Sequence, residues 1–182
     1  MVDLAGHVGF ALALSVPVWL KFGRKESLLF LALAAPTALL PDADLFLRAV
    51  FPVEHHGITH TVAFAATLAL VLGALAATVV APRLRTRIDR YLGGQPSTGQ
   101  VFTFSALAFF TGASSHLVAD IFSAPDIAPP VKPFLPFTDT PVIVDAIYYD
   151  AVIWNFGLLG VMLLIHGTIF WYAGRTVRAN GV

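Results

Sequence analysis

The amino-acid sequence predicts an all-α protein, a polytopic bundle of about five membrane-spanning helices with a proline-rich outer loop. Hydrophobic residues make up 57% of the 182-residue chain, and charged residues make up only 12%. A typical soluble domain has about 25% charged residues, so lipid is the expected solvent for much of this chain. A bundle of this kind uses most of the chain, and we expect one integral membrane domain over residues 1–182 without a separate soluble domain.

Five apolar stretches are long enough, or nearly so, to cross a bilayer. They lie at roughly 4–20, 27–41, 61–81, 101–122 and 151–173. The second stretch has about fifteen residues, which as a helix reach about 22 Å across a hydrocarbon core of about 30 Å. It must therefore tilt little, thin the bilayer or extend past Pro41. The residues before the first stretch lack the basic region of a signal peptide, so we expect that stretch to be retained.

Lysine and arginine residues cluster after alternate stretches, and short loops rich in these residues stay in the cytoplasm. Nine of the eleven basic residues follow the first, third and fifth stretches: Lys21, Arg24, Lys25, Arg83, Arg85, Arg87, Arg90, Arg175 and Arg178. The pattern predicts an integral protein of the cell membrane with its N-terminus outside and its C-terminus in the cytoplasm. The formal net charge is zero, so the arginines from 83 to 90 are interpreted as topology and head-group anchors rather than as a nucleic-acid site.

Five of the six histidines and several aspartates fall at the ends that this orientation places outside the cell. These residues are His7, Asp42, Asp44, His55, His56, His60, His116 and Asp120. The exception is His166, which lies about 24 Å along a helix from Asp150, towards the cytoplasmic end. We expect His166 to hydrogen-bond to a neighbouring helix and leave it out of the site.

Three short segments carry most of this polar group, and each has a functional and a structural interpretation. His116 and Asp120 are four residues apart on one helix face, where they can hold one cation, or where Asp120 only orients the His116 ring. Asp42 and Asp44 lie two residues apart just beyond a helix and could also form a solvated turn. The segment from 54 to 61 places three histidines around one glycine, which is unusual for a soluble loop.

An ionisable group deep in a membrane helix costs about 2.5 to 3.5 kcal/mol and needs a partner. This applies to His7, which as a lone histidine would more often be a structural hydrogen-bonding group. A divalent metal would be such a partner, because structural zinc sites reach binding energies of about 10 to 16 kcal/mol. The chain has no cysteine, so any metal must bind to nitrogen and oxygen, and zinc is the favoured metal.

The donor groups are more numerous than one tetrahedral metal site requires. Two ions, or one ion with supporting carboxylates, are equal alternatives. In either case, water bound to the metal would have a pKa near 7 and would act as the nucleophile, with Asp44 or Asp120 as the candidate base.

These segments resemble the motifs of a family of membrane-bound metal-dependent hydrolases, whose bacterial members include LexA-regulated inner-membrane proteins. The family pattern has a Gly-His pair, a Leu-Pro-Asp-x-Asp segment, a His-Arg-Gly-x-Thr-His-Ser segment and a His-x-x-x-Asp helix followed by a Pro-Phe loop. The matching segments here are Gly6-His7, Leu40 to Asp44, His55 to Thr61, His116 to Asp120 and Pro133-Phe134. The resemblance covers most of the chain and implies a metal site formed by His7, Asp42, Asp44, His55, His60, His116 and Asp120.

His56 stands where the family usually has an arginine. That arginine would suit a substrate phosphate through a bidentate contact, whereas histidine carries a positive charge only when it is protonated. His56 is therefore either an additional metal ligand or a sign of a changed substrate preference.

The outer loop from 123 to 150 holds half of the twelve prolines together with several aromatic residues. It is either a stiff lid over the metal at the lipid interface or a connector packed on the bundle. Lys132 is the only basic residue of this loop. We treat it as a candidate substrate-binding residue for an anionic head group, although a lone interfacial lysine usually extends into the head-group region.

The sequence predicts a membrane-embedded hydrolase that uses one or two divalent ions to activate water against an ester or phosphoester. A lipid or a lipid-linked head group at the extracytoplasmic face is the expected substrate class, so membrane lipid is the expected partner and nucleic acid is not. The alternative is a metal-binding or metal-transporting membrane protein, for which ionisable residues should continue to the other face; only His166 offers this. A third possibility is a structural protein with a fold-stabilising metal.

Overall fold

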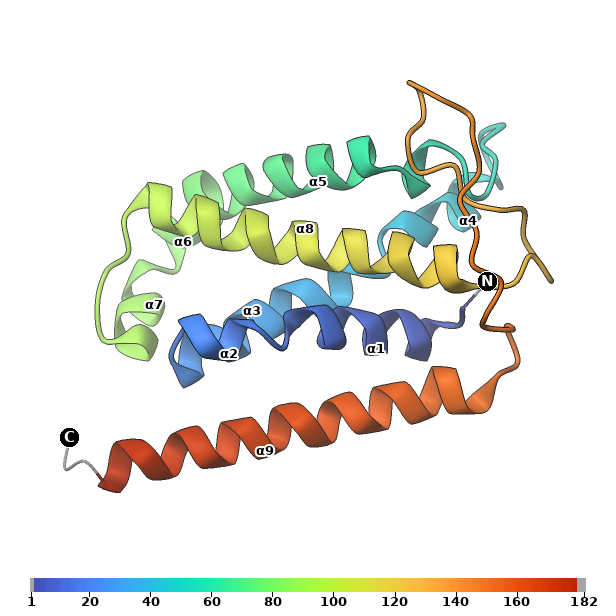
Figure 1. The fold of residues 1–182 in the computed structure, drawn as a ribbon. Helices are drawn as coiled ribbons and strands as arrows, with labels where there is room; N and C mark the ends of the chain where they lie inside the picture. Colours follow the sequence, from blue (N-terminus) through green and yellow to red (C-terminus); the bar gives the residue numbers. More distant parts are fainter. Residues whose placement is uncertain (1, 180–182) are drawn as a thin grey trace.

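The computed structural model describes residues 2–179 and confirms the predicted helical membrane bundle (Figure 1). Five helical segments are long and apolar enough to cross a membrane, and they coincide with the five predicted stretches. Their bounds are Leu4–Lys21, Arg24–Leu47, Val62–Arg83, Thr98–Phe122 and Ile153–Gly174. The described part of the chain contains no β-strand, only an isolated bridge between Ser123 and Ile147.

Several spans consist of more than one helix. The first span contains α1 (Leu4–Ser15) and α2 (Val18–Lys21), and the second contains α3 (Arg24–Thr37) and α4 (Asp44–Leu47). The third contains α5 (Val62–Leu75), a π-helical turn (Ala76–Val80) and α6 (Ala81–Arg83), and is followed by α7 (Arg85–Leu92). The fourth is α8 (Thr98–Phe122), and the fifth is a π-helical turn (Ile153–Gly157) followed by α9 (Leu158–Ala179).

The second span continues past Pro41, which is one of the three outcomes expected for this short stretch. Helix α3 ends at Thr37, and the chain makes a 3-10 turn at Pro41–Ala43 before α4 begins. Proline suits the start of such a turn because the N–H group that it lacks would have no helical partner there. The turn places Asp42 and Asp44 inside the span, where both side chains are buried.

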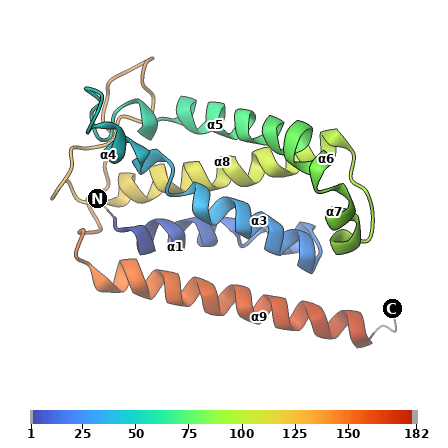
Figure 2. The same ribbon diagram turned by 180° about the vertical axis from the view of Figure 1, so that it is seen from behind.

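Helix α8 lies at the centre of the bundle and packs against α1, α3 and α5, while α9 packs against α1 (Figures 1 and 2). The N-terminus, α4 and the loop 123–150 lie at one end of the bundle, which we call the site end. The C-terminus, α6 and α7 lie at the other end. The arginine-rich segment and the histidine-containing segments are therefore at opposite ends, as the sequence predicted.

A glycine allows α3 and α8 to pack closely near the site end. A Cβ atom at Gly112 would lie 2.2 Å from the carbonyl oxygen of Ala34, so a larger residue does not fit without movement. Four residues further along each segment, Nδ1 of His116 lies 2.6 Å from the carbonyl oxygen of Ala38. The contact at Gly112 thus sets the helix separation at which His116 can reach the second span.

We expect Gly112→Ala to destabilise the protein by about 1 to 3 kcal/mol, because the added methyl group forces α3 and α8 apart. Gly99→Ala in the first turn of the same helix is the matched control, since a Cβ atom there would contact nothing within 4 Å. The control should be neutral or slightly stabilising. Denaturant titration of both variants in detergent measures the difference, and equal effects would contradict this account of the helix contact.

Candidate metal centre

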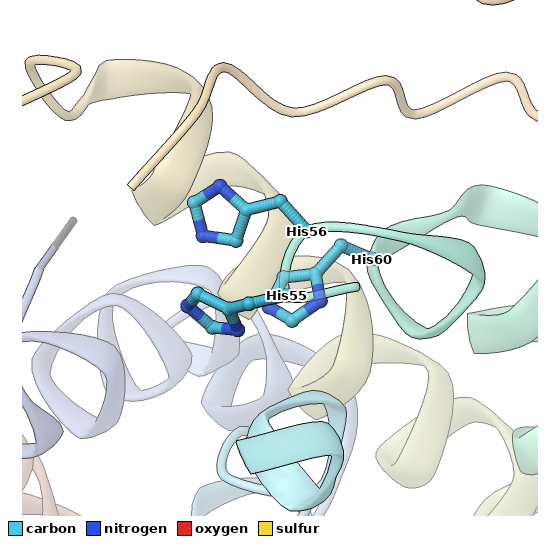
Figure 3. A group of neighbouring side chains, drawn as sticks. All are labelled: His55, His56 and His60. Carbon is cyan, nitrogen blue, oxygen red and sulfur yellow. The ribbon is translucent and has the colours of Figure 1, made fainter. Parts of the chain in front are cut away.

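Four segments that are far apart in the sequence bring imidazole and carboxylate groups together at the site end. They are α1, the turn before α4 together with the start of α4, the loop before α5, and the last turns of α8. Figure 3 shows the rings of His55, His56 and His60, which gather beside the end of α8. Every residue that the family resemblance implies as a ligand belongs to a group of three whose donor atoms lie within 4.8 Å of one another.

Most of these side chains are buried. Their exposed fractions are 0% for His7, Asp44, His60 and His116, 2% for Asp120, 5% for His56 and 6% for Asp42. His55 is partly exposed. The burial rules out the alternative that Asp42 and Asp44 form a solvated turn.

The centre of the group consists of two triangles of donor atoms that share one edge. That edge joins Nε2 of His60 to Nε2 of His116 at 3.0 Å. Oδ1 of Asp42 lies 3.4 Å from each of these two nitrogens. On the other side, Oδ2 of Asp120 lies 3.1 Å from Nε2 of His116 and 3.6 Å from Nε2 of His60. We call these four residues the inner group.

The separations within each triangle match those between three ligands of one metal ion. Nitrogen and oxygen ligands about 2.0 to 2.1 Å from a tetrahedral zinc ion are about 3.4 Å from one another. The His7 ring adds a further donor, because it stacks on the His116 ring with centroids 3.8 Å apart and places Nε2 3.7 Å from Oδ1 of Asp120. Each triangle of the inner group therefore has the size and the chemical composition of part of a zinc site.

The hydrogen bond of His116 fixes which ring nitrogen faces the inner group. A carbonyl oxygen can only accept a hydrogen bond, so Nδ1 of His116 carries the proton that it donates to Ala38. The neutral ring then has its lone pair on Nε2, which faces Asp42 and Asp120. Because the Ala38 carbonyl orients the ring, Asp120 is not needed for this purpose, and its contact with Nε2 favours the role of a ligand.

Thr59 fixes the ring of His60 in the same way. Its hydroxyl donates to Oδ2 of Asp44 over 2.9 Å and lies 3.0 Å from Nδ1 of His60. Since the hydroxyl proton is used towards Asp44, the hydroxyl oxygen accepts the proton of Nδ1, and the lone pair of Nε2 faces the inner group. Asp44, Thr59 and His60 thus form a carboxylate, hydroxyl and imidazole chain that leads to the metal position.

The buried polar atoms support the presence of a cation in the inner group. Both nitrogens of His7, Oδ1 of Asp42, Nε2 of His56 and both carboxylate oxygens of Asp120 are buried without a hydrogen-bond partner in the described part of the chain. Such groups are costly to bury unless a positive charge compensates them. Burial opposes protonation of His60, but the adjacent carboxylates of Asp42 and Asp44 outweigh it and raise its pKa. The carboxylates therefore favour positive charge here, and a divalent ion would supply it.

Asp44 and His55 form a second group beside the first. Oδ1 of Asp44 lies 3.0 Å from Nδ1 of His55, and the donor atoms of Asp42, Asp44 and His55 can lie within 4.8 Å of one another. Asp42 belongs to both groups and could bridge two ions. The residues therefore suit either two ions, or one ion with Asp44 as a supporting carboxylate.

His56 has an unusual backbone conformation. Its φ angle is +60°, and the amide of Gly57 donates to the carbonyl oxygen of Glu54 over 3.1 Å. This is the pattern of a type II turn, whose third position normally holds glycine or asparagine. A larger residue there costs about 1 to 2 kcal/mol, so contacts of the His56 side chain must compensate.

The side-chain contacts of His56 favour its interpretation as an additional ligand. Nδ1 bonds to the carbonyl oxygen of Pro129, and Nε2 lies 3.6 Å from Oδ2 of Asp120. Burial lowers the pKa of His56 to about 4, so the ring is neutral at physiological pH. With Nδ1 bonded to Pro129, the neutral ring has no second N–H group and no charge to offer a phosphate, so it does not reproduce the bidentate contact of an arginine.

The loop 123–150 crosses the site end and contacts the histidine segment. The Val62 amide donates to the carbonyl oxygen of Pro133 over 2.9 Å, and His56 bonds to Pro129. The loop is therefore packed on the bundle and also adjoins the candidate ligands, so the two expected roles, connector and lid, are compatible. Lys132 lies between these two anchoring prolines, and its contact with a substrate remains a prediction.

His166 lies outside the group, as predicted. Its Nε2 lies 3.0 Å from the carbonyl oxygen of Leu12, and its Nδ1 accepts a hydrogen bond from Nε1 of Trp19 over 2.6 Å. These bonds connect α9 to the first span. The role of Thr59 was not predicted, although its position directly before His60 was an available signal. The roles of the Ala38 and Pro129 carbonyl groups were not predicted either, because they leave no signal in the sequence.

We expect the purified protein, loaded with zinc and desalted, to retain about one or two ions per chain. His116→Ala and Asp42→Ala should lose metal and still insert into the membrane, because each removes a donor from the inner group. His166→Ala is the matched control and should keep the metal content of the wild type. Elemental analysis measures the ions, and a wild-type protein without metal would contradict the assignment.

Replacing Thr59 should weaken metal binding although its side chain is not a ligand. Thr59→Val keeps the shape but removes the hydroxyl between Asp44 and His60, and we expect about a 10- to 100-fold loss of affinity. Thr59→Ser keeps the hydroxyl and should bind metal as the wild type does. Competition with a chelator of known affinity measures both variants, and equal affinities would exclude a role for the hydroxyl.

Comparison with known proteins gives one match. A protein-family model described as YdjM inner membrane protein matches residues 1–180. No curated protein and no solved structure matches the chain.

Proposed function

The chain belongs to the YdjM inner membrane protein family, and from this premise we propose that it is an integral inner-membrane hydrolase of esters or phosphoesters. The observation that carries the proposal is the buried group of imidazole and carboxylate donors at the site end, several of which have no hydrogen-bond partner. The inner group would hold one ion, and Asp44 and His55 would complete a site for a second. Bound there, a divalent ion supplies a Lewis acid and lowers the pKa of water towards 7.

The chain itself supplies the base and the shape of the site. Oδ2 of Asp44 already accepts a hydrogen bond from Thr59, and Oδ1 lies 3.0 Å from Nδ1 of His55, so both of its oxygens are in use. Asp120 has two buried oxygens without a hydrogen-bond partner, and only Oδ2 faces His60 and His116. Asp120 is therefore the better of the two candidate bases, with Oδ1 as the oxygen that would accept a proton from water.

The surroundings of the site favour a substrate in the lipid head-group region. Phe46 and Phe51 near α4, and Phe134 and Phe137 in the loop 123–150, have exposed side chains at the site end. Aromatic residues favour the boundary between lipid and water. A lipid or lipid-linked head group would lie at this depth, and Lys132 would attract its negative charge.

Transport of metal is less well supported by the same observations. A transported ion needs ligands along its path, and His166 is the histidine nearer the other end. Both of its ring nitrogens already have hydrogen-bond partners, Leu12 and Trp19. The hydroxyls of Ser15 and Thr37 donate to carbonyl groups of their own helices and are also in use.

We further propose that the site end faces the outside of the cell, as the basic residues at the opposite end favour. Because the chain has no cysteine, single cysteines report on sidedness without background. A membrane-impermeant thiol reagent should label Val50→Cys from outside intact cells and should not label Arg87→Cys. The reverse labelling would overturn this orientation.

Hydrolysis is tested with the zinc-loaded protein in detergent against a panel of phospholipids and phosphoesters. We expect release of the head group or phosphate by the wild type, loss of activity after chelation, and recovery when zinc is returned. Asp120→Asn should abolish turnover, and His166→Ala should retain it. A fully loaded protein that cleaves no member of the panel would favour the non-catalytic metal-binding role instead.

A further inference from the structure

His56 contacts the candidate metal centre and the outer loop with the two nitrogens of one ring. Nδ1 bonds to the carbonyl oxygen of Pro129, in the middle of the first half of the loop. Nε2 is buried, has no hydrogen-bond partner and lies 3.6 Å from Oδ2 of Asp120. The imidazole therefore links the donor group directly to the loop.

Other bonds hold the loop near its ends, among them the bond from Nδ2 of Asn155 to the Tyr149 carbonyl over 2.8 Å and several between backbone groups. Near the loop ends, the Ala124 amide donates to Ile147 over 2.7 Å, and the Val144 amide donates to Ile121 over 2.8 Å. Further along, Val62 donates to Pro133. These backbone bonds do not depend on whether a metal is present. The bond from His56 to Pro129 can depend on the metal, because the other nitrogen of the ring faces Asp120.

The backbone of His56 indicates that both side-chain contacts matter. A residue with a φ angle of +60° would more easily be glycine, and the next residue, Gly57, leaves no room for a Cβ atom, which would lie 2.8 Å from the carbonyl oxygen of Glu54. The turn is thus tightly constrained, and it aims the His56 ring between α8 and the loop. Strained residues that persist in this way commonly serve a binding or switching role.

We propose that His56 is a positioning residue that fastens the loop 123–150 over the site when metal is bound. The inference rests on the metal site of the proposed function but not on hydrolysis. A neutral imidazole that binds a metal through Nε2 must carry its proton on Nδ1, and this proton is the one donated to Pro129. Metal binding therefore selects the tautomer that holds the loop.

Without the metal, the tautomer of His56 protonated on Nε2 is favoured over the one protonated on Nδ1. The carboxylate of Asp120 then attracts the ring proton to Nε2, where it can form a hydrogen bond. Nδ1 becomes an acceptor that faces the Pro129 carbonyl, also an acceptor, and the two repel each other. The loop segment around Pro129 is released, and the site opens for exchange of substrate or product. The loop thus closes only over a site that holds its ion.

Amide hydrogen exchange of the full-length protein in detergent tests this coupling. In the wild type, zinc should slow exchange at residues 127–134 by about 2- to 10-fold, the factor expected for one hydrogen bond. His56→Gly removes the ring and suits the positive φ angle, so the variant should fold. At saturating zinc it should bind metal through the remaining donors and show no zinc-dependent slowing in this segment.

His166→Ala is the matched control, because it removes a buried imidazole that bonds to Leu12 and Trp19 outside the candidate metal centre. At saturating zinc it should keep the slowing seen in the wild type. Nitrogen NMR of labelled histidines provides a second measurement on the wild type alone, in which zinc should increase the population of the His56 tautomer protonated on Nδ1. The signal is assigned by its absence in His56→Gly.

The outcomes separate this proposal from the proposed function. If His56→Gly retains the zinc-dependent slowing, or if the wild type binds zinc without any slowing, the coupling is overturned while the metal site stands. Wild-type protein that takes up no zinc overturns both. Slowing without hydrolysis of any substrate supports the coupling and contradicts only the proposed reaction.

Discussion

Burial of carboxylates and imidazole lone pairs in one small volume is the constraint on which the rest of this structure depends. Among residues 2–179, neither oxygen of Asp120 has a hydrogen-bond partner, and the side chain is almost fully buried. An unpaired buried carboxylate costs several kcal/mol, so the arrangement needs a positive charge at its centre. The helices can hold these groups together because close contacts such as that between Gly112 and Ala34 bring their backbones within reach. Close packing of small residues such as Gly112 and Ala34 thus brings the polar side chains of separate helices into one buried site.

Two of the imidazole donors are oriented before any ion arrives. His116 is held by a carbonyl group of the second span, and His60 is held by the hydroxyl of Thr59. Each support comes from a different part of the chain, and each leaves Nε2 directed inward. A site arranged in this way loses little side-chain freedom on binding, which favours affinity and a defined geometry. It also couples the ion to the elements that hold the rings.

The sequence allowed the spans, the grouping of donors at one end and the exclusion of His166 to be predicted, because each depends on a local pattern. Hydrophobic runs give the spans, and basic residues give the alternation of the loops. The continuation of the second span past Pro41 could be named only as one of three options, since it depends on what Asp42 and Asp44 find inside the bundle. The roles of the Ala38 and Pro129 carbonyls could not be predicted, because every residue has a carbonyl group and only the fold selects which one is used. The conformation of His56 could not be predicted either, because its φ angle is positive and glycine adopts such an angle more easily than histidine.

His60 lies between the two candidate ion positions, which differ in how many existing bonds an ion would have to replace. Its Nε2 faces Asp42, His116 and Asp120, and its Nδ1 faces Asp44 through Thr59. In the inner group, Asp42 and Asp120 have oxygens without hydrogen-bond partners, so an ion there replaces no existing bond of these oxygens. In the second group, Asp44 is already bonded to Thr59 and is in contact with His55, so an ion there must compete with both. The inner group is therefore the better prepared position. With one ion bound, Asp44 would support His60, and it would become a ligand only if a second ion displaced its present partners.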